Sequence, residues 1–284
     1  MSDKSFFTVG DDGRYDPTPY ALGLWGPDTL NGPAICAIAA YAAENFGSRE
    51  GFAPARFTIE LFKSAHRLPT ATTTTMLRDG NRIRVVQVSV LQYDVDDNEI
   101  LVAQGNVVFL KQGTNPPGGR WVRPEGTDVF TPPDEDEDDR ESYRAWFQSG
   151  DREWSRSMSD SQNTDRLRIF NRPFNPVEDV APTPFQRAVI LAESTSLVTN
   201  SGDGGIGFIN CDLTVAIARL PEGLRLGLEA DSHIEDSGLS VGTANLYDEH
   251  GKFGIGLVTA IDNTAAMIDF TKVNPHSLRT TEMS

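Results

Sequence analysis

The chain contains no apolar run that approaches the roughly 20 residues of a membrane-spanning helix. Its first residues, Met1 to Lys4, also lack the basic-then-apolar order of a signal peptide. From these two absences we expect a cytoplasmic protein with no membrane span. At 284 residues, the chain is long enough for one large domain or two small domains with cores of their own.

Cysteine and basic residues are both scarce. Cys36 and Cys211 each lie in an apolar run, and two such cysteines form neither a disulfide framework nor a metal-binding pattern, so we expect both in the core. The 25 Lys and Arg are outnumbered by 41 Asp and Glu, which gives a net charge of -16, whereas nucleic-acid binding requires a basic surface. We therefore expect no nucleic-acid partner, no metal and no cofactor. The net charge does not exclude a small anionic ligand that a few local Arg or Lys side chains bind.

Two segments are apolar on all sides, which predicts two buried helices. The first covers residues 34–43 and ends near Gly47. The second covers residues 183–197, and Thr183 and Gln186 at its start have the spacing of a capping box.

Glu193 comes directly after the apolar run of the second helix. A buried carboxylate at this place would need a partner or would hold its proton unusually tightly. The alternative is that Glu193 begins a solvated helix end, as the following Ser194, Thr195 and Ser196 indicate. Both interpretations stay open.

Each helix is followed by four long predicted strands, and this recurrence indicates a duplicated unit. The long strands are predicted at 56–62, 69–77, 82–93, 100–111, 208–219, 224–234, 239–247 and 253–261, and shorter ones at 6–9, 153–158 and 166–170.

The recurrence also sets the expected domain boundaries. We expect a first unit over 1–115, a second unit over 151–270 and a tail over 271–284. Between the units lies the Pro/Gly-rich segment 116–150, whose acidic block at 134–139 is typical of a solvated, mobile connector.

The strand predicted at 208–219 has an unusually polar face. In its alternation Cys211 and Leu213 point one way, whereas Asn210, Asp212 and Thr214 point the other way. Such a face looks either at solvent or into a pocket, where its polar groups would meet a substrate.

Several short motifs occur in a fixed order along the chain. They are Asn31-Gly32-Pro33 at the first helix, Leu77-Arg78-Asp79-Gly80-Asn81 on a hairpin, Ala192-Glu193 in the second helix, and Asn210-x-Asp212-Leu213-Thr214 and Arg219-Leu220-Pro221 in the second sheet. Together they resemble the double-hotdog acyl-CoA thioesterases of the type II, TesB-like group. The resemblance covers most of the chain outside the acidic connector and the tail. It implies an α+β double hotdog, in which each of two tandem units has a long buried helix wrapped by a curved antiparallel sheet.

The resemblance also implies an activity, the hydrolysis of a fatty acyl-CoA thioester to the free acid and CoA. In that family an Asp, a Ser or Thr and a Gln of the second unit hold and activate the water, and these positions fall on Glu193, Asn210 and Thr259. None of the three is the family residue. Glu193 can still act as a general base, and Asn210 can orient a water. Asp212 is a further candidate, because a register shift of two residues would bring it into the site.

The resemblance further implies contacts with CoA and between subunits. Gly32 is a candidate for close backbone approach to the substrate. Arg78, Arg82 and Arg84 beside the hairpin are candidates for binding the CoA phosphates. A turn glycine and exposed arginines at a sheet edge explain the same residues equally well. Because hotdog proteins pack sheets against one another, we also expect a homo-oligomer.

Two other functions stay open. The three substituted positions favour a non-catalytic acyl-CoA or lipid-like ligand binder with a degenerate triad. Hotdog hydratases use a His near the buried helix, and the absence of His from both predicted helices disfavours that activity. The G-x-S-x-G motif of Ser-His-Asp hydrolases is also absent, which is consistent with water activation by polar side chains.

Overall fold

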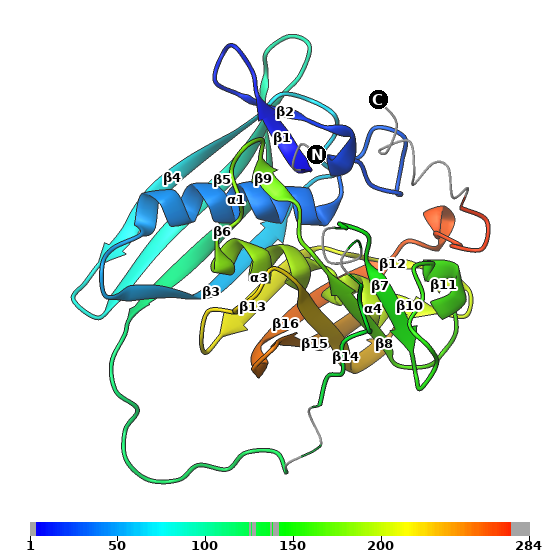
Figure 1. Cartoon of the computed structure of the whole chain (residues 1–284). Helices are drawn as coiled ribbons and strands as arrows, with labels where there is room; N and C mark the ends of the chain where they lie inside the picture. Colours follow the sequence, from blue (N-terminus) through cyan, green and yellow to red (C-terminus); the bar gives the residue numbers. More distant parts are fainter. Residues whose placement is uncertain (1–3, 125, 127–128, 137, 139–141, 274–284) are drawn as a thin grey trace.

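The computed structural model describes residues 4–124, 126, 129–136, 138 and 142–273. Its main feature is one large, mostly antiparallel sheet that runs through both halves of the chain and curves around the helices (Figure 1). No helix among the described residues is both long enough and apolar enough to cross a membrane.

The first half places one helix before four long strands, as predicted. Its elements are β1 (Ser5–Val9), β2 (Tyr15–Pro17), a 3-10 turn (Pro19–Ala21), α1 (Gly32–Gly47), β3 (Phe52–Leu61), β4 (Thr70–Asp79), β5 (Ile83–Tyr93) and β6 (Glu99–Lys111). Helix α1 is rich in alanine and almost fully buried along its first three turns. Small side chains allow the sheet to approach its backbone closely.

The second half repeats this order with more interruptions. Its elements are β7 (Trp146–Ser149), a 3-10 turn (Met158–Ser161), β8 (Leu167–Asn171), β9 (Asn175–Val177), α3 (Pro184–Glu193), α4 (Thr195–Asn200), β10 (Ser201–Gly202), β11 (Gly205–Ile206), β12 (Phe208–Asn210), β13 (Asp212–Ile217), β14 (Leu226–Asp236), β15 (Leu239–Asp248), β16 (Gly251–Asp262) and a 3-10 turn (Thr264–Ala266).

The single helix predicted over 183–197 is two short helices. Its start is as predicted, because the Thr183 and Gln186 side chains form the complete capping box. Its end is different, since Ser194 N–H donates to the carbonyl of Leu191, three residues back instead of four. This tightened turn ends α3 at Glu193 and separates it from α4.

The prediction of a strand at 153–158 is wrong. Ser157 N–H donates to Ser155 Oγ, which itself donates to the Asp160 carboxylate. Local side-chain bonds of this kind favour turns over strands. The strand that opens this region is β7, which lies earlier in the chain.

The sheet joins the two halves edge to edge. Its strand order is β7-β8-β14-β15-β16-β13-β3-β6-β5-β4-β2-β1-β9, with β12 paired to β16. The central seam is the antiparallel pair β13 and β3, in which Val215 lies opposite Phe57. Both of these side chains are fully buried under the helices.

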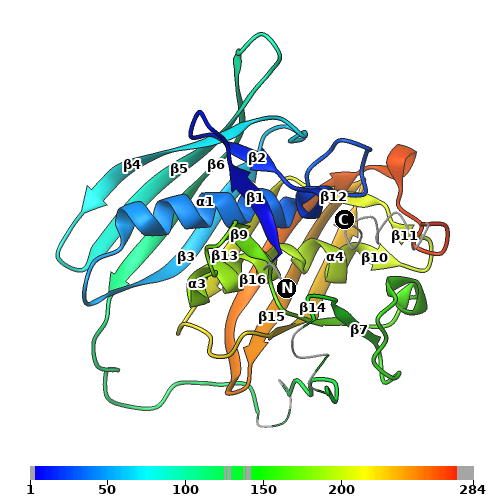
Figure 2. The same cartoon turned by 45° about the horizontal axis from the view of Figure 1, so that its top comes forward.

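Helices α1 and α3 pack side by side in opposite directions on the same face of the sheet (Figure 2). At one end of the pair, Glu44 of α1 accepts hydrogen bonds from Thr183 Oγ1 at 2.6 Å and from Gln186 Nε2 at 2.7 Å. At the other end, Glu193 of α3 lies against Gly32 of α1. A glutamate of each helix therefore meets the first turn of the other.

Part of the predicted connector packs on the face of the sheet that points away from the helices. Phe130 stacks on Tyr247 with ring centroids 5.1 Å apart. Glu135, within the acidic block, accepts a hydrogen bond from Trp146 Nε1 at 2.9 Å. These contacts differ from the expected solvated connector, because the segment carries aromatic residues that cover the sheet. Residues 137 and 139 of the acidic block and the tail from 274 lie outside the described residues.

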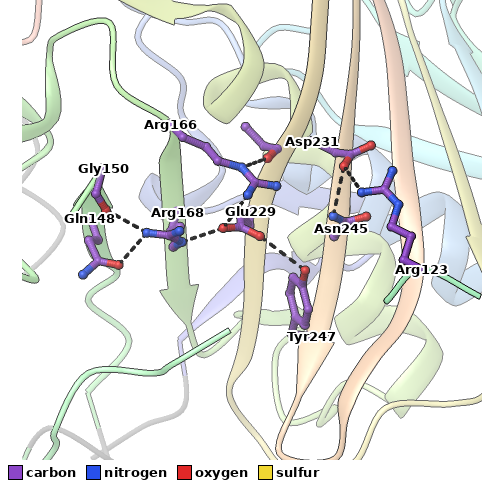
Figure 3. A network of polar contacts seen from close by, with 10 residues as sticks. Arg123, Gln148, Gly150, Arg166, Arg168, Glu229, Asp231, Asn245 and Tyr247 are labelled. Carbon is purple, nitrogen blue, oxygen red and sulfur yellow. Dashed lines mark hydrogen bonds and ion pairs between the residues drawn. The ribbon is translucent and has the colours of Figure 1, made fainter. Parts of the chain in front are cut away.

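A buried carboxylate lies beneath this connector (Figure 3). Glu229 of β14, only 1% exposed, accepts a hydrogen bond from Arg168 Nε at 2.7 Å and another from the Tyr247 hydroxyl at 3.3 Å, and Arg166 pairs with it at 3.1 Å. The network ties β8, β14 and β15 together on the outer face of the sheet.

Candidate active site

A pocket of about 490 Å³ opens where the start of α1, the α3–α4 junction and strand β12 meet. Most of its lining is apolar, with Leu22, Trp25, Leu30, Ile35, Leu61, Phe62, Val102, Leu197, Ile206, Ile209, Ile261, Ile268 and Phe270 among the wall residues. Two charged side chains line it among the described residues, Glu193 and Lys63. The pocket therefore offers an apolar chamber with one carboxylate inside it.

Glu193 is the buried residue that one of the two sequence interpretations predicted. It ends α3, is 7% exposed, and its Oε1 accepts a hydrogen bond from Asn210 Nδ2 at 3.3 Å. Gly32 leaves the space for this carboxylate, because a β-carbon at that position would lie 1.8 Å from Glu193 Oε1. The structure thus brings together three of the candidate residues, Glu193, Asn210 and Gly32.

Burial changes the acidity of this group. Removal of the carboxylate from water raises the pKa of Glu193 from 4.5 to about 8, and the hydrogen bond from Asn210 opposes that rise. About a tenth of the Glu193 side chains would therefore be ionised one pH unit below this pKa, and half at the pKa itself.

The start of α1 supplies a backbone donor to the same pocket. Asn31 Oδ1 accepts the Ala34 N–H at 2.8 Å, and the Asn31 amide group donates to the carbonyls of Tyr20 and Leu22. Pro33 has no N–H. Among the described residues Gly32 N–H has no hydrogen-bond partner, so a helix N-terminus with one free donor lines the pocket.

Asp212 and Thr259 do not join this group. Asp212 Oδ1 accepts the backbone N–H of Thr259 at 2.5 Å, in the place where a strand carbonyl would otherwise accept it. The Thr259 side chain contacts Cys211 Sγ at 3.2 Å, and its neighbours Val258 and Ala260 are the residues of β16 that face the core.

The break between β12 and β13 explains why Asn210 points to a different side from Asp212. The sequence predicts one continuous alternation, in which both would share a face. The structure interrupts the strand at Cys211, which is exposed and not in the core as expected, whereas Leu213 stays fully buried. The interruption shifts the alternation by one residue and turns Asn210 toward α3.

Arg78 and Arg82 lie at the opposite end of α1 from the pocket. Arg84, beside them on the hairpin, donates to the carbonyl of Gly47, the last residue of α1. The pocket lies at Gly32, the first residue, and a helix of this length extends about 24 Å. The structure therefore does not bring these arginines together with Glu193.

Sequence reasoning missed most of the pocket wall. The wall includes Trp25 from the loop before α1 and Lys63 and Phe62 from the loop between β3 and β4. The run Lys63-Ser64-Ala65-His66-Arg67 was a usable signal, because clustered basic residues are rare in so acidic a chain.

Comparison with family sequence models gives two matches. Residues 22–110 match the acyl-CoA thioesterase N-terminal domain, and residues 123–254 match the acyl-CoA thioesterase C-terminal domain. The two matches are consecutive and together cover most of the chain. A search of curated proteins found no significant match.

Solved structures with the same fold are distant in sequence. A putative thioesterase II from Thermobifida fusca YX is 13% identical with a TM-score of 0.64, covering 92% of this chain and 99% of its own. A hotdog-fold protein of unknown function from Alicyclobacillus acidocaldarius is 15% identical with a TM-score of 0.61, covering 90% and 95%. A tesB protein from Mycobacterium avium subsp. paratuberculosis is 15% identical with a TM-score of 0.58, covering 82% and 87%. These likenesses support a sheet-rich hotdog fold.

Proposed function

This chain belongs to the acyl-CoA thioesterase family, and from that membership we propose that it hydrolyses a fatty acyl-CoA thioester to the free acid and CoA. The observation that carries the proposal is the contact of Glu193 with Asn210 at the wall of an apolar pocket. An apolar chamber suits a fatty acyl chain, and a buried carboxyl with a pKa of about 8 suits proton transfer near neutral pH.

The proposed reaction assigns a role to each of three groups. Ionised Glu193 takes a proton from a water that Asn210 orients, and the hydroxide attacks the thioester carbonyl carbon. Gly32 N–H, at the positive end of α1, donates to the oxyanion that forms. The C–S bond then breaks, and protonated Glu193 returns its proton to the CoA thiolate.

The fold carries a second part of the proposal. We propose that residues 1–115 and 151–270 are two hotdog units in tandem, joined by the connector 116–150. The crossed contacts of Glu44 and Glu193 support an internal two-fold relation between the units. Glu44 lies against the first turn of α3 much as Glu193 lies against the first turn of α1, but Thr183 and Gln186 already occupy its carboxylate. We also propose self-association of this tandem through an exposed part of the sheet.

The function is tested by thiol release from short- to long-chain acyl-CoA substrates. Glu193→Gln and Asn210→Ala should each lower kcat by about 100-fold or more, because they remove the base and the group that orients the water. Glu44→Gln is the matched control, since it makes the same change in a glutamate at the other end of the helix pair, outside the pocket, and it should keep activity. Hydrolysis that is absent for every chain length, or unchanged in Glu193→Gln, would overturn the proposal.

A further inference from the structure

The loop that borders the pocket carries two cationic side chains and a histidine, in a protein of net charge -16. Lys63 lines the pocket, and His66 and Arg67 follow on the same loop between β3 and β4. All three side chains are exposed, and none forms an ion pair within the described residues. We call Lys63, His66 and Arg67 the basic loop.

Hydrogen bonds with a buried side chain hold the backbone of the basic loop in place. The buried Gln92 of β5 accepts the His66 N–H at 2.8 Å and donates from Nε2 to the His66 carbonyl at 2.7 Å. Gln92 Nε2 also donates to Thr70 Oγ1. A buried amide that holds both polar groups of one loop residue fixes the path of the chain before any ligand arrives.

The loop is also tied to the segment that precedes α1. Leu30 N–H donates to the carbonyl of Ala65 at 2.9 Å, and Arg67 N–H donates to the carbonyl of Asp28 at 2.8 Å. These bonds hold the basic loop beside the start of α1, where the pocket contains Gly32 and Glu193. Lys63 therefore lies in the pocket wall, and His66 and Arg67 follow it on the same tethered loop.

We propose that the basic loop binds the phosphate groups of CoA. This inference rests on the proposed function, because it assumes that the acyl chain occupies the pocket and that its carrier extends outward. Exposed, unpaired cations on a preorganised loop are suited to an anion, since they lose no existing partner when they bind it. In a chain of such negative charge, they also provide a local attraction that guides an anionic substrate to the pocket.

The proposal differs from the assignment that the sequence offered. Arg78 and Arg82 lie about one helix length from the pocket, whereas Lys63 is part of its lining. The two sets can be separated by experiment, because they lie at opposite ends of α1.

The test is the dissociation constant of CoA itself, measured by calorimetry, because CoA binding needs no turnover. Lys63→Gln/Arg67→Gln should weaken CoA binding by about tenfold or more and reduce its dependence on salt. Binding of pantetheine, which lacks the phosphates, should be the same in this variant as in the unmodified protein. Lys111→Gln/Arg56→Gln, which changes two exposed cations outside the pocket, is the matched control for the lost positive charge.

Three results would overturn the inference. These are CoA binding that the double variant leaves unchanged, CoA binding no tighter than that of pantetheine, and loss of affinity in Arg78→Gln/Arg82→Gln instead. Failure of the proposed function gives a different result: CoA binds through the basic loop, but no acyl-CoA is hydrolysed. CoA binding that is retained in Glu193→Gln shows that the binding measurement does not depend on catalysis, so the two failures can be told apart.

Discussion

Asn210 Nδ2 lies 3.3 Å from Glu193 Oε1, and this contact connects the end of β12 to the end of α3. The donor stabilises the ionised form of a carboxyl whose burial favours the neutral form. Asn210 therefore acts on the proposed base in two ways. It holds the carboxylate in position, and it keeps the pKa of Glu193 low enough for proton transfer near neutral pH.

The pH dependence of the rate should report this balance. Activity requires ionised Glu193, so kcat/KM of the unmodified protein should rise with pH and level off above about 8. In Asn210→Ala the midpoint should move to higher pH, because the hydrogen bond that lowers the pKa of Glu193 is gone. A pH series of initial rates for both proteins checks this. An unshifted midpoint in Asn210→Ala, with only the plateau reduced, would mean that Asn210 does not control the ionisation of Glu193.

The stability of the protein should depend on pH through the same group. The folded-state pKa of Glu193 is raised, so its stabilising contribution is complete below pH 4.5 and is lost as pH rises through about 8. Gln at position 193 cannot ionise. The Tm of Glu193→Gln minus that of the unmodified protein should therefore increase between pH 5 and pH 9. Thermal unfolding at both pH values measures the gain, with exposed Glu235→Gln as the control for one lost negative charge. A Tm difference for Glu193→Gln that does not grow with pH would contradict this prediction.

Gly32→Ala should disrupt the site more than the fold. The new β-carbon would lie 1.8 Å from Glu193 Oε1 and would force the carboxylate away from Asn210. We expect a loss of kcat of about 100-fold, since displaced catalytic groups commonly cost this much. Gly113→Ala is the matched control, because nothing lies within 4 Å of its β-carbon position. Circular dichroism establishes that both variants fold, and a folded Gly32→Ala with full activity would exclude Glu193 from the mechanism.

The buried carboxylate under the connector should matter for stability and not for catalysis. Glu229→Ala leaves Arg168 without its closest carboxylate partner and should cost about 3 kcal/mol in the free energy of unfolding. Glu235→Ala, whose side chain is 60% exposed, should change it by about 0.5 kcal/mol or less. Urea unfolding gives both values. Equal effects of the two substitutions would show that the network in Figure 3 adds nothing to the fold.

Local signals predicted the elements well and their relative placement poorly. The capping box at Thr183 is a property of four neighbouring residues, and the structure confirms it. The break at Ser194 has no comparable signal, because the residues that follow it still form a helix. That break nevertheless sets Glu193 as the last residue of α3, beside Gly32 of the other half. Contacts between distant segments decide this placement.

The candidate site shows the same limit. The turn residues around Gly80 predict a hairpin, but they do not indicate at which end of α1 the hairpin lies. The sequence alone therefore suggests Arg78 and Arg82 as CoA ligands. Thr259 lies on a strand whose side chains alternate, so an offset of one residue decides whether a side chain faces the core. Glu193 and Asn210 meet because of an interruption at Cys211 that the alternating pattern hides.

The pairing of β13 with β3 has a consequence for how the two halves hold together. Five consecutive residue pairs, from Asp212 opposite Glu60 to Ala216 opposite Arg56, join them within one sheet, and this seam does not involve the connector. A protease nick in the connector would therefore yield a heterodimer of two polypeptides and not two free domains. Each half made alone would expose the unpaired edge of β3 or β13. Such an edge can pair with strands of other chains and lead to aggregation. In the single chain, each of these two edges pairs with the other within one molecule.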